Sequence, residues 1–202
     1  MSKFAHNSTK AMHEKLLKFI ESGYHFNTDE VERLKLYFEP VEFPKNTIIE
    51  AEGDIPKYLY YIVSGYLRLF HFDELGNEIT THINCPPGFF TSYFNFINQT
   101  KSGENVECIT ACELLRITKE NLDKLTSECP AMKDFSISVF QESITYNENR
   151  SKELSTLNAE QRYVKLIKNY PGIIQNVPIQ YIASFLGMKP ESLSRIRRKL
   201  IN

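Results

Sequence analysis

Two prolines, Pro40 and Pro44, mark an abrupt change of pattern and limit the folds that are open to this chain. Before them, apolar residues recur with helical spacing over residues 9–22 and 27–38, which predicts two helices. A proline inside a helix removes a backbone hydrogen bond and clashes with the preceding turn. The chain therefore has to leave helical structure near residue 40.

From about Val41 to Ile117, the chain consists of short runs rich in β-branched and aromatic residues. These runs are Thr47–Ile49, Leu59–Val63, Tyr66–Phe72, Ile79–Ile83, Glu107–Thr110 and Leu114–Ile117. Turn signals such as Ser64-Gly65 and Pro86-Pro87-Gly88 separate them. Many short strands at regular spacing predict a β-barrel, roll or sandwich.

Helical patterning returns at Thr118, a good N-cap, and a long helix is expected from Pro130 to about Leu154. This helix carries two apolar stripes, Met132, Phe135, Val139 and Tyr146 on one line and Ile137, Phe140 and Ile144 on another. A long helix with two stripes can pack on its own domain and on a second copy at once. The alternative is that both stripes belong to one intramolecular core.

The helix signal breaks around Ser155–Asn158, where Asn158 and Gln161 resemble a capping box that starts a new helix over Ala159–Asn169. We place a domain boundary at this break. The expected division is a β-rich domain over residues 1–128, a long helix with a hinge over 129–156, and a C-terminal domain over 157–202.

Residues 178–200 fit a helix-turn-helix, in which two short helices cross at a tight turn. Ala183 is small where the backbones approach, Gly187 permits the turn, and Pro190 stands where the second helix would begin. Apolar residues fall at the positions that the shared core needs: Ile182, Leu186, Met188, Leu193 and Ile196.

Charge is distributed unevenly, although the net charge is only −1. Residues 150–202 carry +7 and the rest of the chain −8. The second helix of the motif would present polar and charged residues: Lys189, Glu191, Ser192, Ser194, Arg195 and Arg198. Such side chains can hydrogen-bond base edges and phosphates in a major groove. The competing interpretation is a helical hairpin with a basic outer face.

The four cysteines, Cys85, Cys108, Cys112 and Cys129, form no CxxC pair, and no metal or other cofactor is expected. Cys108 and Cys112 would share one face of a single strand and be buried as small apolar residues. Neither a membrane span nor a signal-peptide core is seen, so a cytoplasmic location without membrane contact is expected.

The order of these features resembles the Crp/Fnr family of bacterial transcription regulators over nearly the whole chain. The strongest local matches are Tyr58–Gly65, Asp73–Glu78, Thr110–Glu113 and the helix-turn-helix. The resemblance implies an α+β fold: a cyclic-nucleotide-binding-like, double-stranded β-roll (jelly-roll-like) flanked by helices, a long dimerisation helix, and a C-terminal helix-turn-helix. A β wing is not evident after the second helix, which would weaken phosphate contacts.

Within the resemblance, the family's base-contacting positions fall at Pro190, Glu191 and Arg195. Glu191 and Arg195 match, whereas Pro190 stands where nucleotide-responsive members often have an arginine. Gln180 matches a position that contacts the DNA backbone. The resemblance thus implies double-stranded DNA, a second copy of the chain and RNA polymerase as partners.

The cyclic-AMP-binding members of the family have a Gly-Glu pair and an Arg-Ser pair that this chain lacks. Ser92-Tyr93 and Ser102-Gly103 stand in their places. A buried phosphate without its arginine would lack a charge partner, so cyclic AMP is not expected to be the effector. The candidate effector pocket consists of Phe90, Ser92, Tyr93, Ser102 and Asn105. Its rings suit an apolar or aromatic effector, or they simply fill the roll.

The expected function is therefore a homodimeric, sequence-specific transcription regulator that reads an inverted-repeat operator and is not an enzyme. One alternative is a ligand-binding module whose helix-turn-helix contacts proteins. Another is an enzyme on a cupin-like roll, for which His71 and His82 would be the only candidate metal ligands on adjacent strands. An iron–sulfur sensor is not expected, because no cysteine precedes Cys85.

Overall fold

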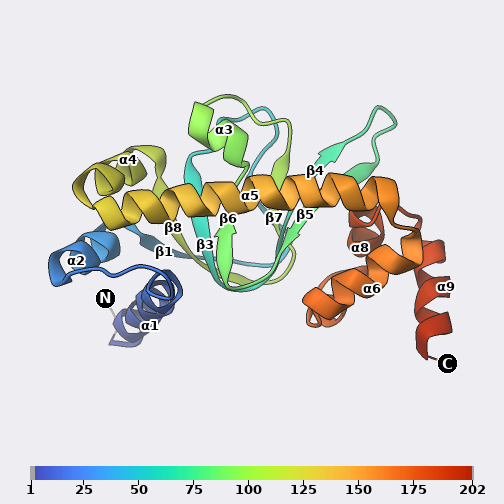
Figure 1. Cartoon of the computed structure of the whole chain (residues 1–202), viewed down its shortest axis with the longest axis horizontal. Helices are drawn as coiled ribbons and strands as arrows, with labels where there is room; N and C mark the ends of the chain where they lie inside the picture. The colour runs from blue at the N-terminus through green and yellow to red at the C-terminus, as the bar shows by residue number, and fades with distance from the viewer. Residues whose placement is uncertain (1–2, 202) are drawn as a thin grey trace.

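A computed structural model describes residues 3–201 and has the expected α+β architecture (Figure 1). Helices α1 (Lys3–Ile20) and α2 (Thr28–Tyr37) precede the strands. The strands are β1 (Glu39–Phe43), β2 (Thr47–Glu50), β3 (Tyr58–Ser64), β4 (Leu67–Phe72), β5 (Glu78–Asn84), β6 (Gly88–Phe90), β7 (Asn105–Cys108) and β8 (Cys112–Thr118). The short helix α3 (Tyr93–Asn98) lies between β6 and β7.

The strands form two antiparallel sheets, in the orders β1-β8-β3-β6 and β2-β7-β4-β5. Side chains from both sheets meet in one apolar core, which includes Tyr60, Ile62, Leu67, Leu69, Phe90, Val106 and Leu114. Apart from the β4–β5 hairpin, the strands pair with partners that are not their neighbours in sequence, and the two sheets form a double-stranded β-roll.

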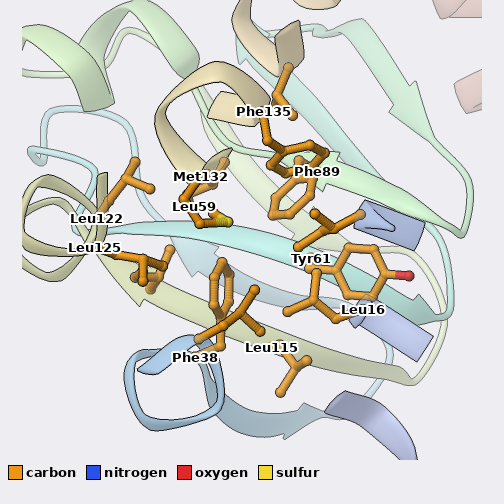
Figure 2. Close-up of a cluster of buried hydrophobic side chains, with 14 of the residues drawn as sticks. Leu16, Phe38, Leu59, Tyr61, Phe89, Leu115, Leu122, Leu125, Met132 and Phe135 are labelled. Atoms are coloured by element: carbon orange, nitrogen blue, oxygen red, sulfur yellow. The ribbon is translucent and has the colours of Figure 1, made fainter. Parts of the chain in front are cut away.

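Helices cover the outer face of the first sheet and create a second core. The helices involved are α1, α2, α4 (Lys119–Glu128) and the start of α5 (Pro130–Thr156). Figure 2 shows this cluster, with Phe38, Leu59, Tyr61 and Leu115 surrounded by side chains from the helices. Alternation along β3 explains the arrangement, since Leu59 and Tyr61 face the helices while Tyr60 and Ile62 face the inside of the roll.

Gly65 is the turn residue that the roll needs between β3 and β4. Its φ of +97° lies in the left-handed region that side chains disfavour, and a Cβ there would stand 2.5 Å from Cys112 Sγ. Only glycine therefore fits at this point of close approach between Gly65 and the start of β8.

Helix α5 runs across the roll from α4 at one end to the C-terminal helices at the other (Figure 1). Its first apolar stripe, Met132, Phe135 and Val139, is buried against the roll, with Tyr146 half-buried further along. In the second stripe, Phe140 is half-buried against Tyr93, but Ile137 and Ile144 remain exposed. The interpretation in which both stripes belong to the monomer's own core is therefore wrong for Ile137 and Ile144.

The C-terminal region contains α6 (Ala159–Asn169), α7 (Ile173–Asn176), α8 (Ile179–Phe185) and α9 (Pro190–Ile201). Its core joins Tyr163, Leu166, Ile182 and Leu193 to residues of the roll such as Ile83. The expected capping box is present, because Asn158 Oδ1 accepts a hydrogen bond from Gln161 N and Gln161 Oε1 accepts one from Asn158 N, both at 2.9 Å. This cap accounts for the start of α6 directly after the end of α5.

Several sequence-based expectations need correction. The first helix begins at Lys3 rather than near residue 9, and the short elements β1, β6, α3 and α7 were not expected from the pattern. β1 contains Pro40 because it is an edge strand, where a missing N–H can face outward. Cys108 ends β7 and Cys112 begins β8, so the two cysteines lie on different sheets rather than on one face of a single strand. Both are nevertheless buried.

Candidate nucleic-acid interface and ligand cavity

Helices α8 and α9 form the helix-turn-helix, and the turn between them is fixed by backbone hydrogen bonds. Gly187 N donates to Ser184 O and Met188 N donates to Ala183 O, both at 3.0 Å. Gly187 adopts a φ of +65°, and a Cβ there would lie 3.4 Å from Leu154 of α5. Ala183 and Leu193 are fully buried between the two helices and their neighbours.

The outward face of α9 carries the side chains that the sequence singled out. Lys189, Glu191, Arg195 and Arg198 are exposed, and Ser192 and Ser194 are half-buried. On α8, Gln180 is also exposed. These side chains thus lie around one protruding helix, at the end of the molecule furthest from α1 and α2 in Figure 1.

Not all of the C-terminal positive charge belongs to this surface. The Arg150 guanidinium donates to Phe185 O (2.6 Å), and Arg162 donates to Leu186 O (3.0 Å) and Leu157 O (2.6 Å). These two arginines bind the carbonyl groups at the ends of α8 and α5, which helices leave without partners. The charge asymmetry in the sequence therefore overstated the basic surface.

Helix α8 is docked on strand β5 of the roll. Thr80 N donates to Ser184 Oγ (2.9 Å), and Ser184 Oγ donates to Glu78 O (3.3 Å). The hydroxyl of one α8 residue therefore serves two backbone groups of β5. This contact fixes the position of the helix-turn-helix relative to the roll.

Arg68 of β4 lies under this junction with only 1% of its side chain exposed. Its guanidinium pairs with Glu107 and with Glu78, each at 2.5 Å, and donates to Thr80 Oγ1 at 3.2 Å. The same guanidinium lies 3.5 Å from the ring centroid of Tyr181 in α8. A buried cation is thus shared between two carboxylates of the roll and an aromatic ring of the helix-turn-helix.

A cavity of about 790 Å³ lies between the roll and helix α5. Strands β5 and β6 and the start of α3 supply one wall, and α5 supplies another through residues from Phe135 to Asn147. The volume falls within the range of small-molecule pockets, which is roughly 300–1,000 Å³. The roll and the long helix thus enclose a ligand-sized space together.

The structure separates the five predicted pocket residues into two groups. Phe90, Ser92 and Tyr93 line the cavity. Ser102 and Asn105 do not line it: the Ser102 hydroxyl bonds the backbone of Glu104, and Asn105 Oδ1 accepts a hydrogen bond from Glu52 N. These two buried side chains instead hold loops of the roll in place.

Sequence reasoning missed the polar residues that join the cavity walls. His82 of β5 lines the cavity, and its Nε2 lies 2.7 Å from Oδ1 of Asn147 on α5. Its ring also packs against Tyr146, with centroids 5.2 Å apart. His82 and Asn147 are 65 positions apart, so no local pattern could indicate their contact.

The described residues contain neither a metal site nor a membrane-spanning helix. Over residues 3–201, no three His, Cys, Asp or Glu side chains are grouped as metal ligands would be. No described helix is long and apolar enough to cross a membrane.

Comparison with known proteins gives the family context. Residues 40–129 match the family described as cyclic nucleotide-binding domain. The cyclic AMP receptor protein of Thermus thermophilus is 22% identical over 176 residues, which span 85% of this chain and 81% of that protein. Residues 40–129 thus match a cyclic nucleotide-binding domain, and the chain is similar over most of its length to a cyclic AMP receptor protein. These matches support the resemblance to the Crp/Fnr family that the sequence shows.

Two solved structures show how far the fold agrees. The c-di-GMP responsive global regulator CLP of Xanthomonas campestris superposes with a TM-score of 0.67 at 20% identity, over 86% of this chain and 91% of that one. FixK2 of Bradyrhizobium japonicum has a TM-score of 0.70 at 16% identity, over 81% and 84% of the two chains. At such identities this chain shares their fold.

Proposed function

We propose that this chain is a sequence-specific, DNA-binding transcription regulator whose helix α9 reads the major groove, and that it is not an enzyme. The observation that carries this proposal is the exposed polar face of α9 in a helix-turn-helix. Arg195 and Glu191 can recognise guanine and the cytosine amino group, respectively. Lys189, Arg198 and Gln180 would bind phosphates and fix the register of the helix on DNA.

The proposal divides the chain by role into a sensor roll (residues 1–128), a connecting helix (129–156) and a DNA-binding domain (157–202). The cap and backbone turn at residues 156–158, where α5 ends and α6 begins, support the second boundary. Contact with RNA polymerase, which the family resemblance implies, stays a prediction.

We further propose that two copies pair through the exposed stripe of α5. Ile137 and Ile144 are seven residues apart on one face of α5 and are 45% and 59% exposed. Heptad spacing of apolar residues is typical of paired helices. A dimer with two-fold symmetry would present two α9 helices to successive major grooves and so read an inverted repeat.

The effector is proposed to differ from the nucleotides for which relatives are named, cyclic AMP and c-di-GMP. Both are anionic. Among the described residues that line the cavity there is no lysine or arginine, and Lys101 lies on the exposed surface instead. A phosphate placed in the cavity would therefore lose its hydration without gaining a cationic partner.

A selection of binding sites from randomised DNA at low and moderate salt tests the function. The unmodified chain should enrich an inverted repeat, and Arg195→Ala should lose that preference while its thermal unfolding stays unchanged, because Arg195 is exposed. Each base pair read by an arginine is worth about 1–3 kcal/mol of discrimination.

Lys57→Ala is the matched control, since it removes one exposed positive charge from the roll, away from α9. It should keep the selected site. If the unmodified chain enriches no sequence even at low salt, the helix-turn-helix serves protein contacts instead. If Arg195→Ala binds the selected sites as well as the unmodified chain, the role given to Arg195 is wrong.

A further inference from the structure

A second pocket, of about 200 Å³, lies where the last turns of α5 meet α6 and the end of α8. We call it the hinge pocket, because α5 ends and α6 begins beside it. None of the described residues that line it belongs to the β-roll. Its volume is below the roughly 300–1,000 Å³ of pockets for drug-sized ligands, so it suits a ligand of only a few heavy atoms.

Positive charge dominates the walls of the hinge pocket. Arg150 of α5 lines it together with Arg162 and Lys165 of α6. Among the described residues of its walls, Glu153 is the only carboxylate, and it pairs with Lys165 at 2.6 Å and with neither arginine. Within the described chain, the two guanidinium groups are therefore left without an anionic partner.

Both guanidinium groups are fixed in place but keep unused hydrogen-bond donors. Within the described chain, Arg150 donates only to Phe185 O (2.6 Å), and its guanidinium lies 3.9 Å from the Phe185 ring centroid. Arg162 donates from Nε to Leu186 O and from Nη1 to Leu157 O, which leaves its Nη2 free in the same part of the chain. Arginine N–H groups that are held in this way can bind an oxyanion through paired hydrogen bonds.

The two arginines also disfavour one another. Burial lowers the pKa of Arg150, and the nearby positive charge of Arg162 acts in the same direction. An anion between the two would be attracted by both and would offset their repulsion. Three cations and one carboxylate leave two positive charges in the walls, which favours a dianion over a monoanion.

We propose that the hinge pocket binds a small dianionic oxyanion, either inorganic phosphate or a short dicarboxylate, between Arg150 and Arg162. Arg150 precedes the helix break at residues 157–158 and Arg162 follows it. A dianion that is held by both would therefore join the long helix to the C-terminal region. Binding needs no DNA, so failed DNA selection alongside dianion binding would overturn the regulator function and leave this site standing.

Calorimetric titration of the full chain with phosphate, succinate and acetate tests the charge of the ligand. The titrations are run at about pH 8, where phosphate is a dianion, and at one ionic strength set with sodium chloride. We expect at least one dianion to bind with a dissociation constant below about 1 mM and acetate to bind at least about tenfold more weakly. The tighter dianion identifies the source, a phosphate or a dicarboxylate. Acetate binding as tightly, or neither dianion binding at about 10 mM, would overturn the proposal.

Glu153→Gln tests the site through a gain of affinity, which a misfolded chain would not produce. The variant removes the carboxylate from the walls and frees Lys165, so the dissociation constant of the dianion should fall several-fold. Glu148→Gln is the matched control, because Glu148 is exposed on the same helix and does not line the pocket. No gain in Glu153→Gln, or an equal gain in the control, would contradict the position given to the anion.

Arg150→Met tests the predicted contact directly. It should raise the dissociation constant of the dianion at least about tenfold, since a charge-assisted hydrogen-bond partner is lost. Lys168→Met removes an exposed charge of α6 that does not line the pocket and should keep the affinity. Thermal unfolding shows that each variant is folded, and unchanged dianion affinity in folded Arg150→Met would overturn the proposal.

Hydrogen exchange tests whether the dianion joins the two parts of the chain. Leu157 N donates to Glu153 O and Arg162 N donates to Asn158 O, so both amides report opening beside the helix break. If opening releases the dianion, a concentration about ten times its dissociation constant should slow exchange at both amides about tenfold. Exchange that stays as fast with the dianion as without it would contradict a dianion held by both arginines.

Discussion

Glu50 is a carboxyl group that the β-roll keeps away from water. Its Oε1 accepts a hydrogen bond from Tyr58 N (3.3 Å), while Oε2 is buried and has no hydrogen-bond partner among residues 3–201. Burial raises the pKa of Glu50 to about 7, against smaller effects of backbone hydrogen bonds. Below about pH 7 the folded state therefore favours the protonated acid.

In the unmodified chain, ionisation of Glu50 buries a charged carboxylate and lowers the stability of the fold. Glu50→Gln should remove this loss of stability. Because the folded pKa lies above the unfolded value, the carboxyl stabilises the fold most below about pH 4.5 and loses that contribution as the pH rises to about 7. The variant should gain about 2 kcal/mol over the unmodified chain at pH 8 and almost nothing at pH 4.5. Chemical denaturation at both values measures the gain, and Glu52→Gln, at an exposed site, should show none.

Arg68 is a residue whose removal should be costly because it leaves buried charge behind. Arg68→Met keeps the packing volume but leaves Glu107 without its cationic partner, and the Glu107 side chain is only 10% exposed. We expect a loss of about 3 kcal/mol at pH 7.

The double variant Arg68→Met with Glu107→Leu distinguishes two causes of the lost stability: an unpaired buried charge on Glu107, and damage to the packing of the core. It should recover most of the lost stability, because a buried ion pair replaced by apolar side chains is often neutral or stabilising. A double variant as unstable as Arg68→Met would instead place the damage in packing around Phe70, 4.0 Å from the guanidinium.

At the scale of single elements, helix starts were more predictable than short strands. Thr118 and Asn158 each accept a hydrogen bond from the backbone N–H three residues on, as their sequence positions indicated. Capping is a local interaction, so local sequence contains it. Strand β6, in contrast, has three residues and exists because Phe89 and Phe90 pair with β3, some thirty positions away along the chain.

The residues of the candidate sites also divide into those set by local sequence and those set by contacts between distant segments. The face of α9 follows from helical spacing within one segment, so the exposure of Arg195 and Glu191 could be predicted from sequence. The cavity forms because β5 packs beside α5, although the two elements are far apart in the sequence. The contact between His82 and Asn147 could therefore not be predicted from local sequence. Two predicted pocket residues, Ser102 and Asn105, satisfy the roll's own backbone instead.

The exposed apolar stripe of helix α5 is the proposed dimer interface. Ile144→Asp should dissociate the proposed dimer, because each copy loses a buried apolar side chain and gains a buried charge, which together raise the dimer's dissociation constant about a hundredfold or more. Sedimentation equilibrium measures the change. Leu75→Asp, at an 87% exposed position in the β4–β5 turn, should leave the oligomeric state unchanged. Ile144→Asp that remains dimeric would exclude this stripe as the interface.

At the scale of the whole molecule, a few hydrogen bonds connect the helix-turn-helix to the roll. Ser184→Ala should loosen this docking, since Thr80 N loses its acceptor and Glu78 O its donor. A net hydrogen bond is worth about 1 kcal/mol, so hydrogen exchange at the Thr80 amide should accelerate by roughly five- to tenfold.

Ser155→Ala is the comparison for this experiment, because Ser155 bonds only within α5 at its exposed end. It should leave the Thr80 amide protected. Exchange at Thr80 that is as slow in Ser184→Ala as in the unmodified chain would mean that apolar contacts, such as those of Ile83, hold the two parts together without help from the hydroxyl.

The length of α5 has a mechanical consequence. A helix of 27 residues is about 40 Å long. Its buried stripe packs on the roll, and beyond Asn147 it meets the C-terminal region, where Arg150 donates to Phe185 O. A tilt of this helix about its N-terminal turn therefore displaces its C-terminal end the most. A tilt of five degrees about its first turn displaces its far end by about 3.5 Å, close to the spacing of adjacent base pairs. In the proposed DNA complex, a displacement of that size would move α9 out of register with its half-site.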